Sequence, residues 1–115
     1  MDREAIINQI YDAFNGRDID AVLAHFHTAV TWPNGWEGGY VHGHNEVRDY
    51  WTRQWKELTP VVTPVKLSIF DELTIEVSVH QLVKNLNGDV VADDIVKHTY
   101  SFDHGLIIKM EINAV

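Results

Sequence analysis

Apolar residues recur every three or four positions near the start of the chain, which is the spacing of an amphipathic helix. Asp2 precedes this stripe, where a helix N-cap residue accepts hydrogen bonds from the first backbone amides. Asn15-Gly16 follows it and indicates the end of the helix, because glycine adopts the left-handed conformation at low cost. The sequence therefore predicts a helix between these signals, with an inward stripe of Ile6, Ile7, Ile10, Tyr11 and Phe14.

Two more helices are predicted in the first half of the chain. Asp18 can cap a short one, whose inward residues would be Ile19, Val22, Leu23 and Phe26. Thr59-Pro60 should end the third, because the residue before a proline avoids the helical conformation. This third helix would carry a heavily aromatic stripe of Val47, Tyr50, Trp51, Gln54, Trp55 and Leu58.

A short strand and an irregular stretch are predicted between the second and third helices. The strand covers residues 29–32 and ends at Pro33. Residues 33–43 are rich in glycine and aromatic side chains, unlike a passive solvated linker.

The second half of the chain predicts four strands, at residues 61–70, 73–86, 89–102 and 106–113. Pro64 places the first near a sheet edge or a bulge. Asn87-Gly88 predicts a two-residue hairpin, because both turn positions require positive φ.

Helices followed by strands predict an α+β domain that covers residues 1–115. We expect three N-terminal helices packed on one face of a curved, mostly antiparallel sheet, which together form a cone-shaped barrel around an apolar cavity.

The hairpin at Asn87-Gly88 also predicts which residues pair across it and share a face of the sheet. With a loop of only these two residues, position 77 pairs with 98 and position 81 with 94. A bulge past Asp93 would bring Asp93 into the cavity in place of Asp94. The face expected to point inward carries Ile75, Val77, Val79, Gln81, Asp94, Val96, His98, Tyr100 and Phe102.

The remaining strand positions divide into an inner and an outer set. In the last strand, Ile108, Met110 and Ile112 are expected inward, and Lys109 and Glu111 outward. The outer sheet face should form a homodimer interface, because it mixes apolar, small polar and oppositely charged groups. These outer residues are Glu76, Ser78, Leu82, Lys84, Ile95, Lys97, Thr99 and Ser101.

Composition excludes several classes of function. The 115 residues carry a formal net charge of −8, which repels nucleic acid and anionic membranes. The sequence has no cysteine, which removes disulfides, thiolate nucleophiles and Cys-ligated zinc. The first ten residues carry charges where a secretory signal is apolar, and no apolar run approaches the ~20 residues of a membrane span. We expect a soluble cytoplasmic domain.

Neither a metal nor a cofactor is expected. The histidine pairs His25/His27 and His42/His44 have no acid-rich partner motif that would complete a metal site. The chain also has no glycine-rich phosphate loop.

Four segments carry a resemblance to a known family: FNGRDIDAVLAHF, AVTWPNGWEGG, HGHNEVRDYW and HTYSFDHGLIIKMEI. The chain resembles the nuclear transport factor 2-like superfamily, most closely its SnoaL-like branch, which includes polyketide cyclases. The resemblance implies a cone-shaped α+β barrel and a homodimer. It does not select a chemistry, because the superfamily includes isomerases, cyclases, dehydratases, hydrolases and binding modules.

Ketosteroid isomerases of this superfamily offer a residue-level comparison. Their oxyanion-stabilising tyrosine corresponds to Tyr11, and their second oxyanion donor, an aspartic acid, corresponds to His98. Their general base is an aspartate before a proline, but Trp32 precedes Pro33 here. An indole has no acid–base capacity near neutral pH, so the comparison does not support ketosteroid isomerisation.

Four residues are candidates for catalysis. His98 and Tyr11 either polarise a ligand oxygen or bond each other as buried polar groups. Asp94 is either a base oriented by Gln81 or part of a solvated pair at the hairpin end of the sheet. Glu37 lies beside Trp36, where desolvation would raise its pKa, unless it points into water.

The candidate ligand-binding residues are mainly aromatic and aliphatic. Trp32 and Trp36 lie off the predicted helices and are the stronger pocket candidates, whereas the spacing of Trp51 and Trp55 also suits the core. The others are Val77, Val79, Gln81, Val96, Tyr100 and Met110.

Two functional hypotheses follow from these residues. The first is a cofactor-independent protein that binds a small apolar molecule and isomerises, cyclises, dehydrates or hydrolyses it by proton transfer. The alternative is a non-catalytic dimerising or ligand-carrying module whose cavity is filled by its own aromatic side chains.

Overall fold

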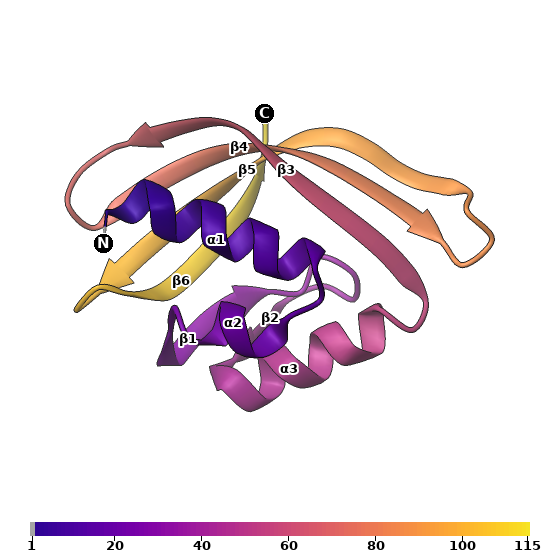
Figure 1. Ribbon diagram of the computed structural model, residues 1–115, viewed down its shortest axis with the longest axis horizontal. Coiled ribbons are helices and arrows are strands. Elements are labelled where there is room, and N and C mark those ends of the chain that lie inside the picture. Colours follow the sequence, from indigo (N-terminus) through magenta and orange to yellow (C-terminus); the bar gives the residue numbers. More distant parts are fainter. Residues whose placement is uncertain (1) are drawn as a thin grey trace.

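The computed structural model describes residues 2–115, which form an α+β fold of three helices and a six-stranded sheet. The strands are ordered β2-β1-β6-β5-β4-β3, and only the β1–β6 pair is parallel (Figure 1). The helices are α1 (Arg3–Asn15), α2 (Ile19–Leu23) and α3 (Gly43–Gln54). The strands are β1 (Phe26–Pro33), β2 (Tyr40–His42), β3 (Leu58–Ile69), β4 (Thr74–Asn85), β5 (Val90–Asp103) and β6 (Leu106–Ala114).

The first two helices begin at the predicted caps. Asp2 accepts a hydrogen bond from the amide of Ala5 at 2.8 Å, and Asp18 accepts one from Ala21 at 3.1 Å. The end of α1 differs from the prediction that Gly16 is left-handed. Gly16 has a right-handed helical backbone with φ −80°, and Arg17 has the positive φ of 62° instead. Arg17 is held there because its guanidinium donates to the carbonyl of Pro60 at 2.6 Å.

The end of α3 was predicted too late. The helix stops at Gln54, and residues 58–60 belong to β3, where they pair with Asn85, Lys84 and Val83 of β4. Pairing with β4 outweighs the helical spacing at Leu58. The predicted strand at 29–32 is also extended, to Phe26–Pro33, and β2 pairs with its end inside the stretch predicted to be irregular.

The register of the long hairpin is as predicted through most of its length. Val77 lies opposite His98 and Gln81 opposite Asp94, so Asp94 and not Asp93 shares the face of Gln81. Near the turn the register shifts, and Lys84 pairs with Val90. Only Gly88 has positive φ in this turn, so the expectation of two such residues was wrong.

A second irregularity changes the inward residues of β6. The register shifts between Ser101 and Phe102, which brings Phe102 opposite Ile107. Ile107 is therefore buried in place of the predicted Ile108, whereas Met110 is buried as predicted. β3 is an edge strand with a shift between Pro64 and Lys66, as Pro64 indicated.

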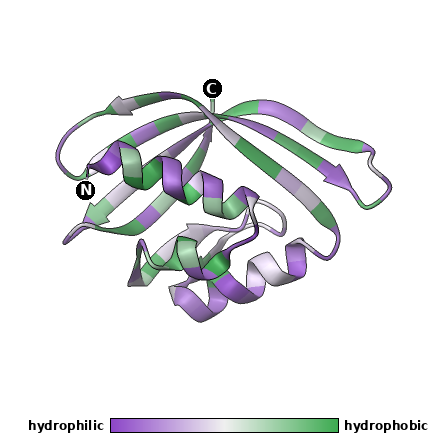
Figure 2. Ribbon diagram, viewed as in Figure 1, coloured by the Kyte–Doolittle hydropathy of each residue, from purple (hydrophilic) through white to green (hydrophobic). Residues whose placement is uncertain are grey.

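The core lies between the helices and one face of the sheet. Alternating hydrophobic and hydrophilic residues along the strands are visible in Figure 2 and give the sheet an apolar face. On this face Ile75, Val77 and Val79 are fully buried, and α1 contributes Ile7 and Ile10. Residues 2–115 contain no helix long and apolar enough to cross a membrane.

Candidate functional site

A cavity of about 250 Å³ lies between the helices and the apolar face of the sheet. Most of its walls are aromatic or aliphatic, and its polar side chains include His98, Gln54 and Gln81. Among the described residues that line it, none carries a charged side chain at neutral pH. Its aromatic walls are Tyr11, Phe14, Trp32, Trp36, Tyr50, Trp51 and Tyr100.

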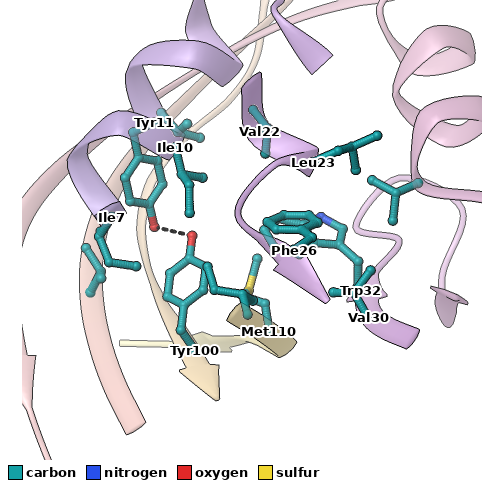
Figure 3. Packing of buried hydrophobic residues seen from close by; sticks show 14 of the residues in the cluster. Ile7, Ile10, Tyr11, Val22, Leu23, Phe26, Val30, Trp32, Tyr100 and Met110 are labelled. Carbon is teal, nitrogen blue, oxygen red and sulfur yellow. Dashed lines mark hydrogen bonds between the residues drawn. The ribbon is translucent and has the colours of Figure 1, made fainter. Parts of the chain in front are cut away.

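Three side chains form a buried hydrogen-bond chain at one wall of the cavity. The Tyr100 hydroxyl donates to the Tyr11 hydroxyl oxygen at 2.8 Å (Figure 3). The Tyr11 oxygen also lies 2.8 Å from Nδ1 of His98. The arrangement that satisfies most groups has Tyr11 donating to Nδ1, which places the proton of the neutral imidazole on Nε2.

This chain leaves one polar atom without a partner. Nε2 of His98 is buried and has no hydrogen-bond partner within residues 2–115. Burial lowers the pKa of His98 to about 4, so the ring is neutral at pH 7. Burial also raises the pKa values of Tyr11 and Tyr100, so both hydroxyls stay protonated. The wall is therefore uncharged, and it holds one buried N–H group without a partner in residues 2–115.

The aromatic walls come from elements far apart in the sequence. Trp32 of β1 stacks on Phe26 at 4.8 Å between ring centroids and meets Trp51 of α3 edge-on at 5.6 Å. Trp55 stacks on Trp51 at 5.8 Å but does not line the cavity. Its Nε1 is the other buried side-chain group without a partner in the described part of the chain.

The structure places Glu37 and Asp94 outside the cavity lining. Glu37 is exposed and forms an ion pair with Arg53. Hydrogen bonds from Arg53 and Asn34 lower the pKa of Glu37, so the expectation that desolvation would raise this pKa was wrong. Asp94 is exposed and accepts from Gln81 at 3.3 Å. Both fit the alternative of a solvated carboxylate.

The other candidates separate into cavity walls and core. Trp32, Trp36, Trp51, Gln81, Tyr100 and Met110 line the cavity. Val77 and Val79 are fully buried core residues, and Val96 packs against the core. These three share the face of His98 but lie outside the cavity lining.

Several lining residues were not predicted, notably Tyr50 and Gln54 of α3 and Val62 of β3. The aromatic stripe of α3 contained the signal for the first two. Val62 could not be found from local pattern, because its place depends on Asn15, which bonds both its amide and its carbonyl, at 2.9 and 2.7 Å.

The paired histidines have other contacts. His44 lies 2.9 Å from the carbonyl of Phe26, His42 lies 3.3 Å from Thr31, and His27 lies 3.5 Å from Asp103. In the part of the chain that the structure describes, no three His, Asp or Glu side chains gather in a way that could hold a metal ion.

Comparison with known families identifies the fold. The model of the SnoaL-like domain matches residues 7–110. The chain belongs to the SnoaL-like domain family. The resemblance noted in the sequence is thereby confirmed.

Several solved structures have a similar fold. An NTF2-like protein of unknown function from Burkholderia pseudomallei is 24% identical with a TM-score of 0.84, covering 97% of this chain and 89% of its own. TerC, co-crystallised with polyporic acid, is 24% identical with a TM-score of 0.83 over 96% and 89%. Rv0760c from Mycobacterium tuberculosis, in complex with estradiol-17β-hemisuccinate, is 15% identical with a TM-score of 0.81 over 94% and 89%.

No curated protein matches the sequence significantly. At these identities the structural likeness establishes the fold alone, and the function has to be argued from the cavity of this chain.

Proposed function

We propose that this SnoaL-like protein binds a compact, neutral, largely apolar molecule in its cavity and holds an acceptor oxygen of that molecule on Nε2–H of His98. The observation that carries the proposal is the buried, unpartnered Nε2 among the cavity-lining residues within 2–115. A buried donor without a partner costs about 1–3 kcal/mol, and a ligand oxygen would remove that cost.

Cavity size and lining support this class of ligand. An engineered cavity of about 150 Å³ can hold benzene, so about 250 Å³ accommodates more than one ring. The lining favours flat molecules, because Trp32 and Trp51 offer ring faces and edges. A charged ligand would meet no opposite charge on the described lining, and burying an unpaired charge is costly. We regard the cavity as the interior of the cone-shaped barrel that the family implies.

Two structural relatives were solved with oxygen-bearing organic ligands, although both of those ligands are acids and the ligand proposed here is neutral. TerC was solved with polyporic acid and Rv0760c with estradiol-17β-hemisuccinate. Both are organic molecules that contain oxygen, as the proposed site of this chain requires. Because the space between the helices and the sheet is not filled by the protein's own aromatic side chains, the cavity favours a ligand site over a non-catalytic module with a filled interior.

The chemistry this site can supply is polarisation of an oxygen. A neutral imidazole N–H in an apolar wall stabilises negative charge that develops on a carbonyl oxygen. We therefore retain a proton-transfer enzyme, an isomerase, cyclase, dehydratase or hydrolase, as the second candidate. The proposal assigns Glu37 and Asp94 no part in it, because neither lines the cavity.

Binding of two matched probes tests the proposal. We expect 2-acetylnaphthalene, a flat ketone, to bind about three- to ten-fold more tightly than naphthalene in calorimetric titrations, because one hydrogen bond is gained. In His98→Leu this preference should disappear, and in His80→Gln, on the outer face, it should remain.

Equal affinities for the two probes, or a preference that survives His98→Leu, would contradict the proposal. If the stranded Tyr11 hydroxyl prevents His98→Leu from folding, the double variant Tyr11→Phe/His98→Leu removes it.

We also propose that the outer sheet face forms a homodimer interface. Two polar pairs lie on this face within the chain: Lys97 lies 3.6 Å from Glu76, and His80 lies 2.7 Å from Asp93. Ile95 is exposed on the same face, and the mixture of apolar and polar groups suits a partly polar isologous contact.

Sedimentation at micromolar concentration should therefore show a dimer. Leu82→Asp should convert it to a monomer, whereas Leu86→Asp, at the exposed hairpin tip, should not. A wild-type monomer, or a dimer that survives Leu82→Asp combined with charge reversal at Lys97, would refute the interface.

A further inference from the structure

The loop between β1 and β2 forms part of the cavity wall. Trp36 lines the cavity from this loop, and a Cβ atom on Gly35 would lie 3.7 Å from Cδ1 of Ile112 near the end of β6. Gly35 and Ile112 are both lining residues and both exposed, so the cavity meets solvent where they approach each other. The loop therefore stands beside one place where the cavity meets solvent.

Asn34 holds this loop together as one unit. Its side-chain oxygen accepts from the amides of Trp36 and Glu37 at 3.1 and 2.7 Å. Its side-chain amide donates to Oε1 of Glu37 at 2.9 Å, and its backbone amide donates to the carbonyl of Gly39 at 2.9 Å. Because Asn34 is buried, these bonds exclude water and tie the position of Trp36 to that of Glu37.

Arg53 of α3 attaches this unit to the body of the protein. Its Nη1 donates to both carboxylate oxygens of Glu37 at 2.8 Å, and its Nε donates to Asp49 at 3.0 Å. The Arg53 and Glu37 side chains are 42% and 45% exposed. An exposed ion pair of this kind is weak enough to open thermally, yet strong enough to bias the loop toward one position.

We infer that the Glu37–Arg53 ion pair is a latch that keeps the Trp36 loop closed beside the cavity mouth and thereby limits the rates of ligand entry and exit. This inference rests on the proposed function, since it assumes that the cavity takes up a ligand. Neither latch residue lines the cavity, so both act by positioning Trp36.

This position of the latch predicts a particular kinetic result. If ligand passes only when the loop is open, loss of the latch raises the open fraction, in the free and the bound protein alike. The association and dissociation rate constants should then rise by the same factor, about two- to five-fold for an exposed ion pair, and Kd should stay constant.

Stopped-flow tryptophan fluorescence with 2-acetylnaphthalene measures both rate constants. We expect both to rise in Glu37→Gln and in Arg53→Met, with wild-type rates approaching those of the variants at 1 M NaCl because salt screens the pair. Arg48→Met is the matched control, because it breaks a different exposed ion pair of α3, with Asp20. Its rates should equal those of the wild type.

Hydrogen exchange of the Trp36 and Glu37 amides reports loop opening without a ligand. Faster exchange in both latch variants together with faster binding supports the latch. Unchanged exchange, or faster exchange with unchanged rate constants, overturns it. Failure of the wild type to bind the probe overturns the proposed function and, with it, the role of the latch in ligand passage.

Discussion

Acidification from pH 7 to pH 4 should remove about 3 kcal/mol of folding free energy through His98 alone. Burial lowers the pKa of this side chain from 6.5 to about 4. As the pH falls through 6.5, the unfolded chain binds a proton at His98 while the folded chain does not. The contribution is therefore fully present above pH 6.5 and is lost as the pH falls toward 4.

Urea unfolding of the wild type and of His98→Leu between pH 7 and pH 4 isolates this contribution. The difference in unfolding free energy between the two proteins should shrink with acid by about 3 kcal/mol, because the variant has no group to titrate there. His80→Gln, which alters an exposed histidine, should leave the wild-type slope nearly intact. A constant difference between wild type and His98→Leu would show that His98 is not buried as described.

Replacement of Trp51 by alanine should cost about 3–5 kcal/mol of unfolding free energy. Trp51 is buried and contacts the rings of Phe14, Phe26, Trp32 and Trp55 with centroids 5.3–6.1 Å apart. Its removal deletes both the buried area and these ring contacts, and it enlarges the cavity.

Trp55→Ala is the matched control for this prediction. Trp55 is only partly buried and lies under the Arg17 guanidinium at 5.0 Å, so its loss should cost clearly less. Both costs are measured by chemical denaturation monitored by circular dichroism. A Trp51→Ala cost no larger than that of Trp55→Ala would mean that Trp51 belongs to the ligand site and contributes little to the core.

The sheet register could be predicted because the hairpin turn and the alternation of side chains act locally. Val77 opposite His98 follows from the position of the turn and a pairing rule. The errors lie where tertiary contacts override local pattern. Leu58 leaves the helix because β4 pairs with it, and Ile107 replaces Ile108 because β5 shifts register after Ser101.

The candidate site was predictable to the same extent. The strand pairing and the family resemblance predicted that Tyr11 and His98 lie at the same wall of the cavity. The structure places the Tyr11 hydroxyl oxygen 2.8 Å from Nδ1 of His98. The direction of the hydrogen bonds among Tyr100, Tyr11 and His98 depends on Tyr100, whose bond to Tyr11 is a tertiary contact. The low pKa of Glu37 likewise depends on Arg53, 16 residues later in the chain.

The most direct test of the central claim is the nitrogen NMR spectrum of His98 during titration with 2-acetylnaphthalene. We expect a neutral ring at pH 7 with its proton on Nε2, and an Nε2–H signal that shifts when the ketone is added but changes much less with naphthalene. A proton on Nδ1, or an Nε2 signal that responds equally to both probes, would contradict it.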